Sequence, residues 1–239
     1  MDRDTIFAPS TAPGRAGIAV VRISGPAAAA ALALLTRGGK PPPPRVATLA
    51  NLSAAESTEL LDRAMVLWFP APASFTGEDV LELHLHGGTA VTGAVLEELS
   101  RMPSLRPAGP GEFTRRAFEG GKLDLTEAEA IADLVDAETA GQRRQALRQM
   151  QGALGSLYES WREQLVAALA HVEAVIDFSE EEIPDDLLSR VIASTQAIRD
   201  DIARHLADGG VGERIRSGFR IALTGAPNVG KSSLLNALA

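Results

Sequence analysis

The feature that most constrains the fold of this chain is the octapeptide GAPNVGKS at residues 225–232. It matches the phosphate-binding pattern G-x-x-x-x-G-K-[ST] at every fixed position. The glycines let the backbone curl so that its N–H groups face phosphate oxygens, while Lys231 reaches the β- and γ-phosphates and Ser232 is suited to ligate magnesium. Such a loop joins a strand to a helix, and the segments RIALTG and SSLLNALA predict that strand and that helix.

The sequence ends at Ala239, soon after this loop. The segments that would supply a second magnesium-orienting threonine, position a water and read the base are therefore not in it, and hydrolysis needs all of them. We expect the chain to be a piece of a longer protein, cut inside its nucleotide-binding domain. We also expect this piece to be inactive in hydrolysis.

Composition excludes several classes of protein. The 31 acidic and 23 basic residues give a net charge of -8, which disfavours a lone nucleic-acid binder unless the bases cluster. There is no cysteine, so disulfides and thiolate metal sites are ruled out, and the charged start of the chain does not resemble an export signal; we infer a reducing cytoplasm. No apolar segment reaches the roughly 18 to 20 residues of a membrane helix.

Residues 1–120 predict a mixed α+β domain. A β-branched run of strand length, GIAVVRI, is followed by SGPAAAAALALL, which predicts a helix capped by Ser24 or Gly25. The prolines and glycines of TRGGKPPPPR predict a surface loop. Two further strands are predicted at RAMVLWFP and DVLELHLH, and a second helix at GGTAVTGAVLEELSRM.

The pattern becomes helical from residue 121. We assign residues 121–212 to the first part of a helical domain and residues 213–239 to the start of a nucleotide-binding domain with its phosphate loop. Thr126, with Glu129 three residues later, predicts a capping box at the first helix.

Apolar side chains then recur at three- and four-residue steps from Leu147 to Ile176. Gly152 and Gly155 predict breaks or kinks in this stripe, which we interpret as core packing. A third amphipathic stretch, residues 187–206, is expected to stop at the glycines of ADGGVGE.

Charge is unevenly distributed. Residues 126–186 hold fourteen acids and four bases, whereas residues 101–122 hold five bases and two acids. We expect an anion to dock on this basic stretch, with a solvated basic loop as the alternative. The acidic run DFSEEEIPDD is interpreted as an exposed helix end rather than a metal site, because its carboxylates occupy consecutive positions.

Five segments, taken in order, resemble the MnmE (TrmE) family of tRNA modification GTPases. They are APGRAGIAVVRISGP, LWFPAPASFTGEDVLELHLHGG, RPAGPGEFTRRAFEGGKLDLTEAEAIADLVDAET, AVIDFSEEEIP and GAPNVGKSSLLNALA. The likeness covers essentially the whole chain.

The resemblance implies a fold: an N-terminal folate-binding and dimerising α+β domain, an all-α helical domain, and an α/β P-loop G domain inserted into the helical one. It also implies an activity, the modification of C5 of the wobble uridine (position 34) of certain tRNAs to aminomethyl- or carboxymethylaminomethyl-uridine, with the flavoprotein partner MnmG (GidA). A reduced folate, 5-formyltetrahydrofolate or 5,10-methylenetetrahydrofolate, would supply the one-carbon unit. The expected protein is a cytoplasmic homodimer that hydrolyses GTP, uses Mg²⁺ and K⁺, and meets tRNA through the complex with its partner.

The resemblance also carries site residues. Arg22 in VRISG, Glu82 in VLELH and Lys122 in GGKLD match folate contacts. A carboxylate such as Glu82 can accept the adjacent N–H donors of a pterin edge, and the two cations can pair with folate oxygens. Taken without the resemblance, Arg22 and Glu82 would be solvent-facing strand residues.

For GTP, the matching positions are Asn228, Val229, Gly230, Lys231, Ser232 and Ser233. Within them Ser232 matches the magnesium ligand and Asn228 the potassium ligand. No catalytic residue is assigned. His84 and His86 share a strand face, but two histidines without a third ligand do not predict a metal site.

Two other functions stay open. The chain could serve only as a folate-binding dimerisation module without GTP hydrolysis, its loop being vestigial, or it could belong to an unrelated P-loop NTPase such as a ribosome-assembly GTPase. Folate titration separates the MnmE-like GTPase and the folate-binding module from an unrelated P-loop NTPase, because only the first two would bind folate. Nucleotide titration of the full-length protein separates the GTPase from the module.

Overall fold

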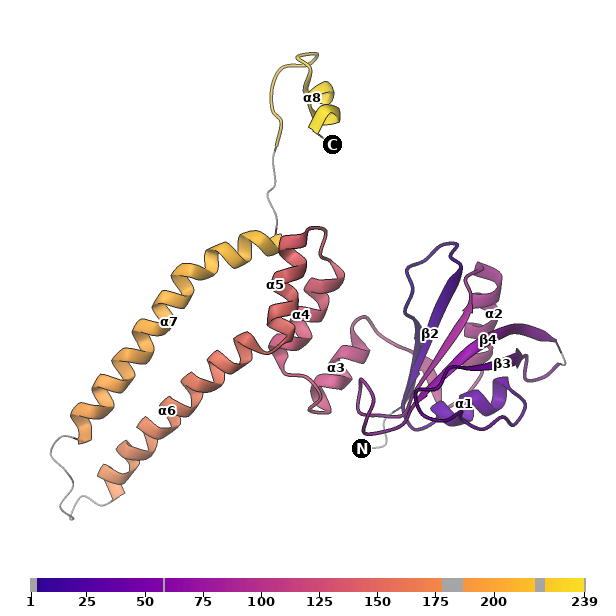
Figure 1. Cartoon of the computed structure of the whole chain (residues 1–239), viewed down its shortest axis with the longest axis horizontal. Helices are drawn as coiled ribbons and strands as arrows, with labels where there is room; N and C mark the ends of the chain where they lie inside the picture. The colour runs from indigo at the N-terminus through magenta and orange to yellow at the C-terminus, as the bar shows by residue number, and fades with distance from the viewer. Residues whose placement is uncertain (1–3, 58, 178–186, 218–221, 239) are drawn as a thin grey trace. The chain divides into compact units, whose positions relative to one another are not determined.

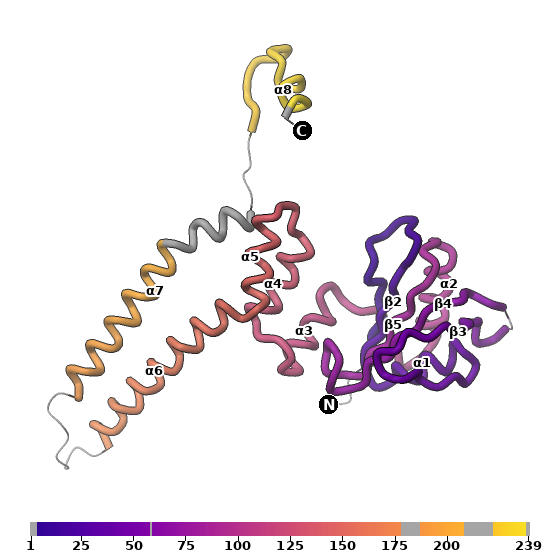
Figure 2. Tube along the Cα trace, in the orientation of Figure 1, coloured from indigo at the N-terminus to yellow at the C-terminus, as the bar shows by residue number. Residues whose placement is uncertain are grey.

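The computed structural model describes residues 4–57, 59–177, 187–217 and 222–238, and for residues 208–217 and 238 it describes the backbone alone (Figures 1 and 2). The chain divides into two compact units, Met1–Ala128 and Glu129–Ala239. Within the described ranges, no helix is long and apolar enough to cross a membrane.

The first unit is built on a six-stranded sheet with the order β3-β4-β5-β2-β1-β6. Neighbouring strands run antiparallel except β1 and β6, which are parallel. The strands are β1 (Thr5–Pro9), β2 (Ile18–Ser24), β3 (Thr48–Ser53), β4 (Leu60–Phe69), β5 (Val80–His86) and β6 (Leu105–Pro107). The predicted strands at 17–23, at RAMVLWFP and at DVLELHLH are thus confirmed as β2, β4 and β5.

Helices α1 (Ala28–Leu35) and α2 (Thr89–Ser100) pack on the sheet, and α3 (Glu112–Glu119) follows β6. Strand side chains alternate between the two faces of a sheet, and in β2 and β5 every second residue is buried in the core shared with α1 and α2. The fully buried residues of this core include Val21, Leu32, Leu83 and Leu99. The intervening positions of β2 and β5 therefore lie on the opposite face.

The cap of α1 differs from the prediction. The N-cap residue is Ala27, with no side-chain cap of its own, and the Ala27 N–H donates instead to Thr5 Oγ1 at 2.8 Å. Gly25 makes this close approach to β1 possible, because it has φ +132° and a Cβ there would lie 2.8 Å from Thr5 Cα. A tertiary hydroxyl thus replaces the local cap expected from Ser24 or Gly25.

The helices from residue 125 onward are α4 (Leu125–Val135), α5 (Ala140–Met150), α6 (Ala153–Asp177), α7 (Leu187–Ser217) and α8 (Lys231–Leu238). Helices α5, α6 and α7 contact one another, and α6 lies beside α7 (Figures 1 and 2). Trp161 of α6 donates its indole N–H to Asp201 of α7 at 2.8 Å, and His205 stacks edge-on against the same ring.

The capping box predicted at Thr126 and Glu129 is displaced by two residues. Asp124 accepts the Glu127 N–H at 2.8 Å, and Glu127 reaches back to the Asp124 N–H at 2.8 Å, so the helix starts two residues earlier. The carboxylate of Asp124 competes better for these N–H groups than a hydroxyl does. A second capping box, Thr139 with Gln142, opens α5 and had not been predicted.

Of the two helix breaks predicted at glycines, one is confirmed and the other is wrong. Gly152, with φ +79°, separates α5 from α6, whereas Gly155 lies inside α6. The helix stop predicted at ADGGVGE is wrong, because α7 continues through those glycines to Ser217; glycine lowers helix stability without forbidding the conformation.

The stripe from Leu147 to Ile176 is less buried than core packing requires. Leu165, Leu169 and Ile176 expose 45%, 56% and 68% of their surface. In the described part of this unit, α6 packs on α7 and α5 along a narrow seam of small and apolar residues that includes Ala168 and Ile198, so the rest of the stripe is exposed.

Two predictions fall partly outside the described residues. The acidic run predicted to be a helix end lies, apart from Asp177, outside the described residues. Residues 222–225 lead into the phosphate loop without sheet pairing in the described part of the chain, and residues 220–221 of the expected strand lie outside it.

Candidate functional site

Arg22 and Glu82, both expected to contact folate, lie opposite each other on β2 and β5. Arg22 Nε donates to Glu82 Oε1 at 2.9 Å, and Arg22 Nη2 lies 2.8 Å from the same oxygen. For the second oxygen, Glu82 Oε2, the one hydrogen-bond partner among the described residues is His84 Nε2, at 3.4 Å. The pair therefore keeps one carboxylate oxygen directed away from the arginine, on the sheet face that α1 and α2 leave open.

Two aromatic rings hold the Arg22 guanidinium. Its Cζ lies 5.7 Å from the centre of the Phe75 ring and 5.8 Å from that of Phe113. Both distances allow cation–π attraction, which restricts where the guanidinium can point. Phe75 comes from the loop between β4 and β5, and Phe113 from the first turn of α3.

Lys122, the third residue expected at folate, follows α3. Its ammonium donates to the Pro72 carbonyl at 3.1 Å, and its methylenes pass Gly77 so closely that a Cβ there would lie 3.4 Å from Lys122 Cγ. Arg22 and Lys122 thus touch the same loop, residues 70–79, although no direct contact joins Lys122 to Arg22 or Glu82. The structure brings Arg22 and Glu82 together and places Lys122 against the loop that Arg22 also contacts.

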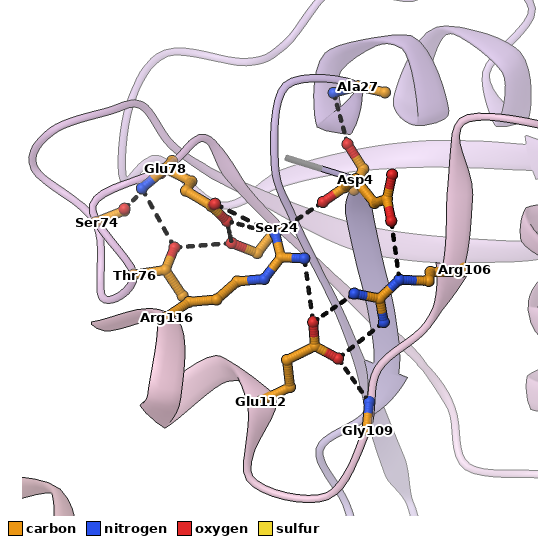
Figure 3. Close-up of polar contacts among 11 residues, drawn as sticks. Asp4, Ser24, Ala27, Ser74, Thr76, Glu78, Arg106, Gly109, Glu112 and Arg116 are labelled. Carbon is orange, nitrogen blue, oxygen red and sulfur yellow. Dashed lines mark hydrogen bonds and ion pairs between the residues drawn. The ribbon is translucent and has the colours of Figure 1, made fainter. Parts of the chain in front are cut away.

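A buried polar network fastens this loop to α3 (Figure 3). Arg116 is only 5% exposed and donates to the Glu78 carboxylate at 3.1 and 3.2 Å and to Glu112 Oε1 at 3.1 Å. It also donates to the Asp4 carbonyl at 2.8 Å. Ser24, two residues beyond Arg22 on β2, donates to Glu78 Oε2 at 2.8 Å. The network therefore ties together β2, α3 and the loop.

Glu112 is a second carboxylate of the network and accepts several hydrogen bonds. It accepts two hydrogen bonds from Arg106, at 2.7 and 2.9 Å, and one from the Gly109 N–H at 2.7 Å, besides that from Arg116. The Arg106 hydrogen bonds, assisted by those from Gly109 and Arg116, lower the pKa of Glu112 to about 2, against the opposing effect of burial.

This arrangement corrects the expectation that the basic stretch 101–122 docks an anion. Each of its four arginines pairs with a carboxylate of the protein itself: Arg101 with Glu97 and Glu98, Arg106 with Asp4 and Glu112, Arg115 with Glu119, and Arg116 with Glu78 and Glu112. The stretch builds a framework, and of its bases Lys122 alone has no carboxylate partner in the described part of the chain.

The lowered pKa of Glu112 predicts acid sensitivity of the first unit. The group is deprotonated in the folded state down to about pH 2 but takes up a proton near its ordinary pKa of 4.5 when unfolded. Its contribution is therefore complete above pH 4.5 and is lost as the pH falls from 4.5 toward 2, by up to about 3 kcal/mol. Urea unfolding between pH 2.5 and 7 should show this loss, and a Glu112→Gln variant should have lower stability at pH 7 and a flatter pH profile.

The curled loop and the helix after it match the prediction from the sequence, whereas residues 222–225 of the predicted strand do not pair in a sheet within the described part of the chain. Asn228 and Gly230 both have left-handed backbones, with φ +64° and +89°, and α8 begins at Lys231. The Lys231 ammonium folds back onto the Gly225 and Ala226 carbonyls at 3.0 and 2.7 Å. The backbone of residues 226–230 thus curls ahead of a helix N-terminus, the arrangement that favours phosphate.

The two histidines of β5 have different partners. His86 Nδ1 lies 2.6 Å from Asp62 Oδ1, and its backbone N–H donates to Asp62 Oδ2 at 2.8 Å, whereas His84 faces Glu82. Across the described residues, no group of three histidine, cysteine or acidic side chains is placed to hold a metal ion.

A cavity of about 430 Å³ lies elsewhere in the first unit, between the loop that joins β1 to β2 and helix α2. Its walls are mainly apolar, with Thr11, Thr89 and Thr92 among them, and they include none of the three predicted folate residues.

Sequence reasoning missed Phe75, Phe113, Glu78 and Arg116 as parts of the site. Arg116 stood in the basic stretch, but its partner Glu78 is 38 residues away, and nothing in one sequence marks such a pair. The phenylalanines carried no periodic signal. Knowledge of which strands pair would have been needed to find any of them.

Two family models match the chain in succession. Residues 5–122 match the model described as GTP-binding protein TrmE N-terminus, and residues 125–234 match the MnmE helical domain. The boundary between the matches, residues 123–124, falls directly before α4.

Individual relatives are similar over nearly the whole chain. A tRNA modification GTPase MnmE of Parvibaculum lavamentivorans is 59% identical over 236 residues, which are 99% of this chain and 54% of the relative. That of Rhodospirillum rubrum is 57% identical over 251 residues, 100% of this chain and 55% of the relative. The human mitochondrial 5-taurinomethyluridine-[tRNA] synthase subunit GTPB3 is 54% identical over 235 residues, 98% of this chain and 48% of that protein. The chain thus spans about half the length of the relatives it matches.

Proposed function

The chain belongs to the MnmE (TrmE) family of tRNA modification GTPases, and from this premise we propose that its protein is the GTP-hydrolysing component of tRNA wobble-uridine modification. The product would be aminomethyl- or carboxymethylaminomethyl-uridine at position 34. The observation that carries the proposal is the phosphate loop, in which a left-handed Gly230 leads directly into helix α8 at Lys231.

In this proposal GTP lies on the loop formed by residues 228–233. Lys231 leaves the Gly225 and Ala226 carbonyls and pairs with phosphate oxygens, and the N–H groups at the start of α8 face the same anion. The Ser232 hydroxyl would hold Mg²⁺, and the Asn228 amide oxygen would hold K⁺. Both are oxygen donors, the ligand type that these cations take. The two ions would neutralise charge that develops on the phosphates.

The reduced folate is proposed to lie at Arg22, Glu82 and Lys122. The donor set fits the group: Glu82 Oε2 has no hydrogen-bond partner closer than 3.4 Å among the described residues and can accept pterin N–H donors, while Arg22 and Lys122 offer N–H donors to carbonyl or carboxylate oxygens. Bound there, 5-formyltetrahydrofolate or 5,10-methylenetetrahydrofolate would supply the one-carbon unit. The polar network behind Phe75 and Phe113 keeps the Arg22 guanidinium in place for this contact.

We further propose that the protein is a cytoplasmic homodimer, joined through the N-terminal domain, and that it works with the flavoprotein MnmG (GidA). The domain limits 1–120, 121–212 and 213–239 are kept as the functional division of the chain. The charge of the chain supports a partner protein that also binds the tRNA. Because the net charge is -8, most of the surface of this chain would repel a nucleic-acid backbone.

The test of the function is reconstitution. The full-length protein, the flavoprotein, GTP, a reduced folate and an unmodified tRNA transcript are combined, and nucleosides are then analysed for the C5-modified uridine. Product that requires both proteins and GTP is expected. Hydrolysis of GTP without any modified uridine, under conditions in which a relative from the family gives product, would refute the proposal.

The folate site makes a separate prediction. Arg22→Ala and Glu82→Ala should each weaken binding of 5-formyltetrahydrofolate by roughly tenfold to a hundredfold, because each removes a charge-assisted hydrogen bond. The measurement is calorimetric titration of the full-length protein. Arg63→Ala is the matched control, an exposed arginine on neighbouring β4, and should bind as the unaltered protein does. Unchanged folate affinity in both the Arg22 and the Glu82 variant would refute the assignment of the folate site to these residues.

A further inference from the structure

The arginines of α6 and α7 whose side chains are described have partners near them in the protein. Arg162 donates to Glu159 at 2.8 Å, Arg199 to Asp200 at 2.7 Å and Arg204 to Asp201 at 2.8 Å. Arg190 also has a partner. The positive charge of these four described arginines is therefore largely neutralised within the unit.

Helix α5 is different. Its sequence AGQRRQALRQM has three arginines and no acid, and Arg143, Arg144 and Arg148 are all exposed. None of the three makes a side-chain hydrogen bond or an ion pair with any residue that the structure describes. They are three of the four bases in residues 126–186, among fourteen acids, so carboxylates are plentiful in this part of the sequence and yet none is paired with them.

The three arginines share one face of the helix. At about 100° per residue they fall within an arc of roughly 140°, with Arg144 and Arg148 one turn apart. Ala146, which is 2% exposed, points the other way, toward the packed side of α5. We call Arg143, Arg144 and Arg148 the α5 basic face.

Helix stability does not account for this face. Arg148 lies in the last turn, where a cation favours the helix dipole, but Arg143 and Arg144 are the fourth and fifth residues, near the positive end. Like charges this close together on a helix also repel one another, so the cluster lowers the stability of the helix rather than raising it. Its charge is thus available to a ligand.

We propose that the α5 basic face binds the phosphate backbone of the tRNA substrate, an inference that rests on the proposed function. Guanidinium groups present fork-shaped donors that match phosphate oxygens, whereas contacts of this kind carry no base sequence. The face would hold and orient the tRNA, while the acidic surface around it would repel the tRNA backbone from other positions on the protein. This chain then contributes its own tRNA contact in addition to those of the partner protein.

The experiment compares two triple variants of the full-length protein. Arg143→Gln/Arg144→Gln/Arg148→Gln removes the α5 basic face, and Arg162→Gln/Arg199→Gln/Arg204→Gln removes the same number of paired arginines. Binding of an unmodified tRNA transcript with a wobble uridine is measured by fluorescence anisotropy between 50 and 200 mM KCl. Circular dichroism and GTP hydrolysis, in the absence of tRNA, check that both variants fold.

The α5 variant should bind tRNA at least about tenfold more weakly at 50 mM KCl, and its plot of log affinity against log salt should be shallower by about 2 to 3. The paired-arginine variant should stay within about twofold of the unaltered protein. Equal loss in both variants, or no loss in the α5 variant, would overturn the proposal.

Two further outcomes separate this inference from the proposed function. If tRNA binding is unchanged but binding of the flavoprotein weakens, the face contacts protein and the inference fails. If the unaltered protein binds no tRNA by itself yet supports modification with its partner, the inference likewise fails while the proposed function stands.

Discussion

Replacement of Arg116 by methionine is expected to lower the free energy of unfolding of the first unit by about 3–5 kcal/mol, because it removes a buried guanidinium that forms ion pairs with both Glu78 and Glu112. Glu78 loses the guanidinium and keeps the Ser24 hydroxyl, while Glu112 retains Arg106. Methionine fills much of the volume, so the lost charge, rather than a cavity, dominates. Urea unfolding followed by the fluorescence of Trp68 reports this unit alone when Trp161, the other tryptophan, is replaced by phenylalanine.

The neighbouring residue gives the matched control. Arg115 lies on the same helix, is 67% exposed in its side chain and sits 4.0 Å from Glu119, so Arg115→Met should cost less than about 1 kcal/mol. Adding Glu78→Gln to Arg116→Met should recover part of the loss, since it removes a largely buried negative charge that has lost its guanidinium. If both arginine variants unfold at the same urea concentration, the network is not the framework of this unit.

Weaker folate binding should accompany that loss even where the unit remains folded. The network fixes α3 and loop 70–79, which carry Phe113 and Phe75, and these rings hold Arg22. Stability and ligand affinity therefore share one set of contacts. In the proposed site, Arg116 would in this way set the position of Arg22 without contacting the folate itself.

Local sequence patterns predicted those features that depend on neighbouring residues alone. Alternation and β-branching identified β2 and β5, and fixed spacing identified the loop around Gly230 and Lys231. Short strands such as β6, with three residues, carry too little pattern to be recognised, and they form because a partner strand supplies their hydrogen bonds.

Features that depend on distant pairing were missed or misplaced. The cap of α1 comes from Thr5, on another strand, and the acidic partner of Arg116 comes from a loop 38 residues away. The basic stretch 101–122 therefore suggested an anion site, although its arginines neutralise internal carboxylates. Three arginines that form no ion pair with a described residue lie instead on α5, in a segment whose overall charge is strongly acidic. The net charge of that segment gave no sign of them.

Lys231→Ala is expected to weaken GTP binding by at least about a hundredfold in the full-length protein. The ammonium, now bonded to the Gly225 and Ala226 carbonyls, would bond to two phosphate groups, and two charge-assisted hydrogen bonds are worth roughly 3–6 kcal/mol together. Lys231→Arg should weaken GTP binding almost as much, because a planar guanidinium cannot replace a compact ammonium inside the curled loop. Titration with a fluorescent GTP analogue measures both.

Lys40→Ala is the control, an exposed lysine in the proline-rich loop, and should bind GTP normally. Folate affinity should be equal in all three lysine variants, because Lys231 is not among the residues that approach Arg22 or Glu82. Loss of GTP with folate binding intact would assign the nucleotide to this loop and keep the two sites chemically separate. Normal GTP binding by Lys231→Ala would instead support the reading in which the loop is vestigial and the chain acts as a folate-binding module.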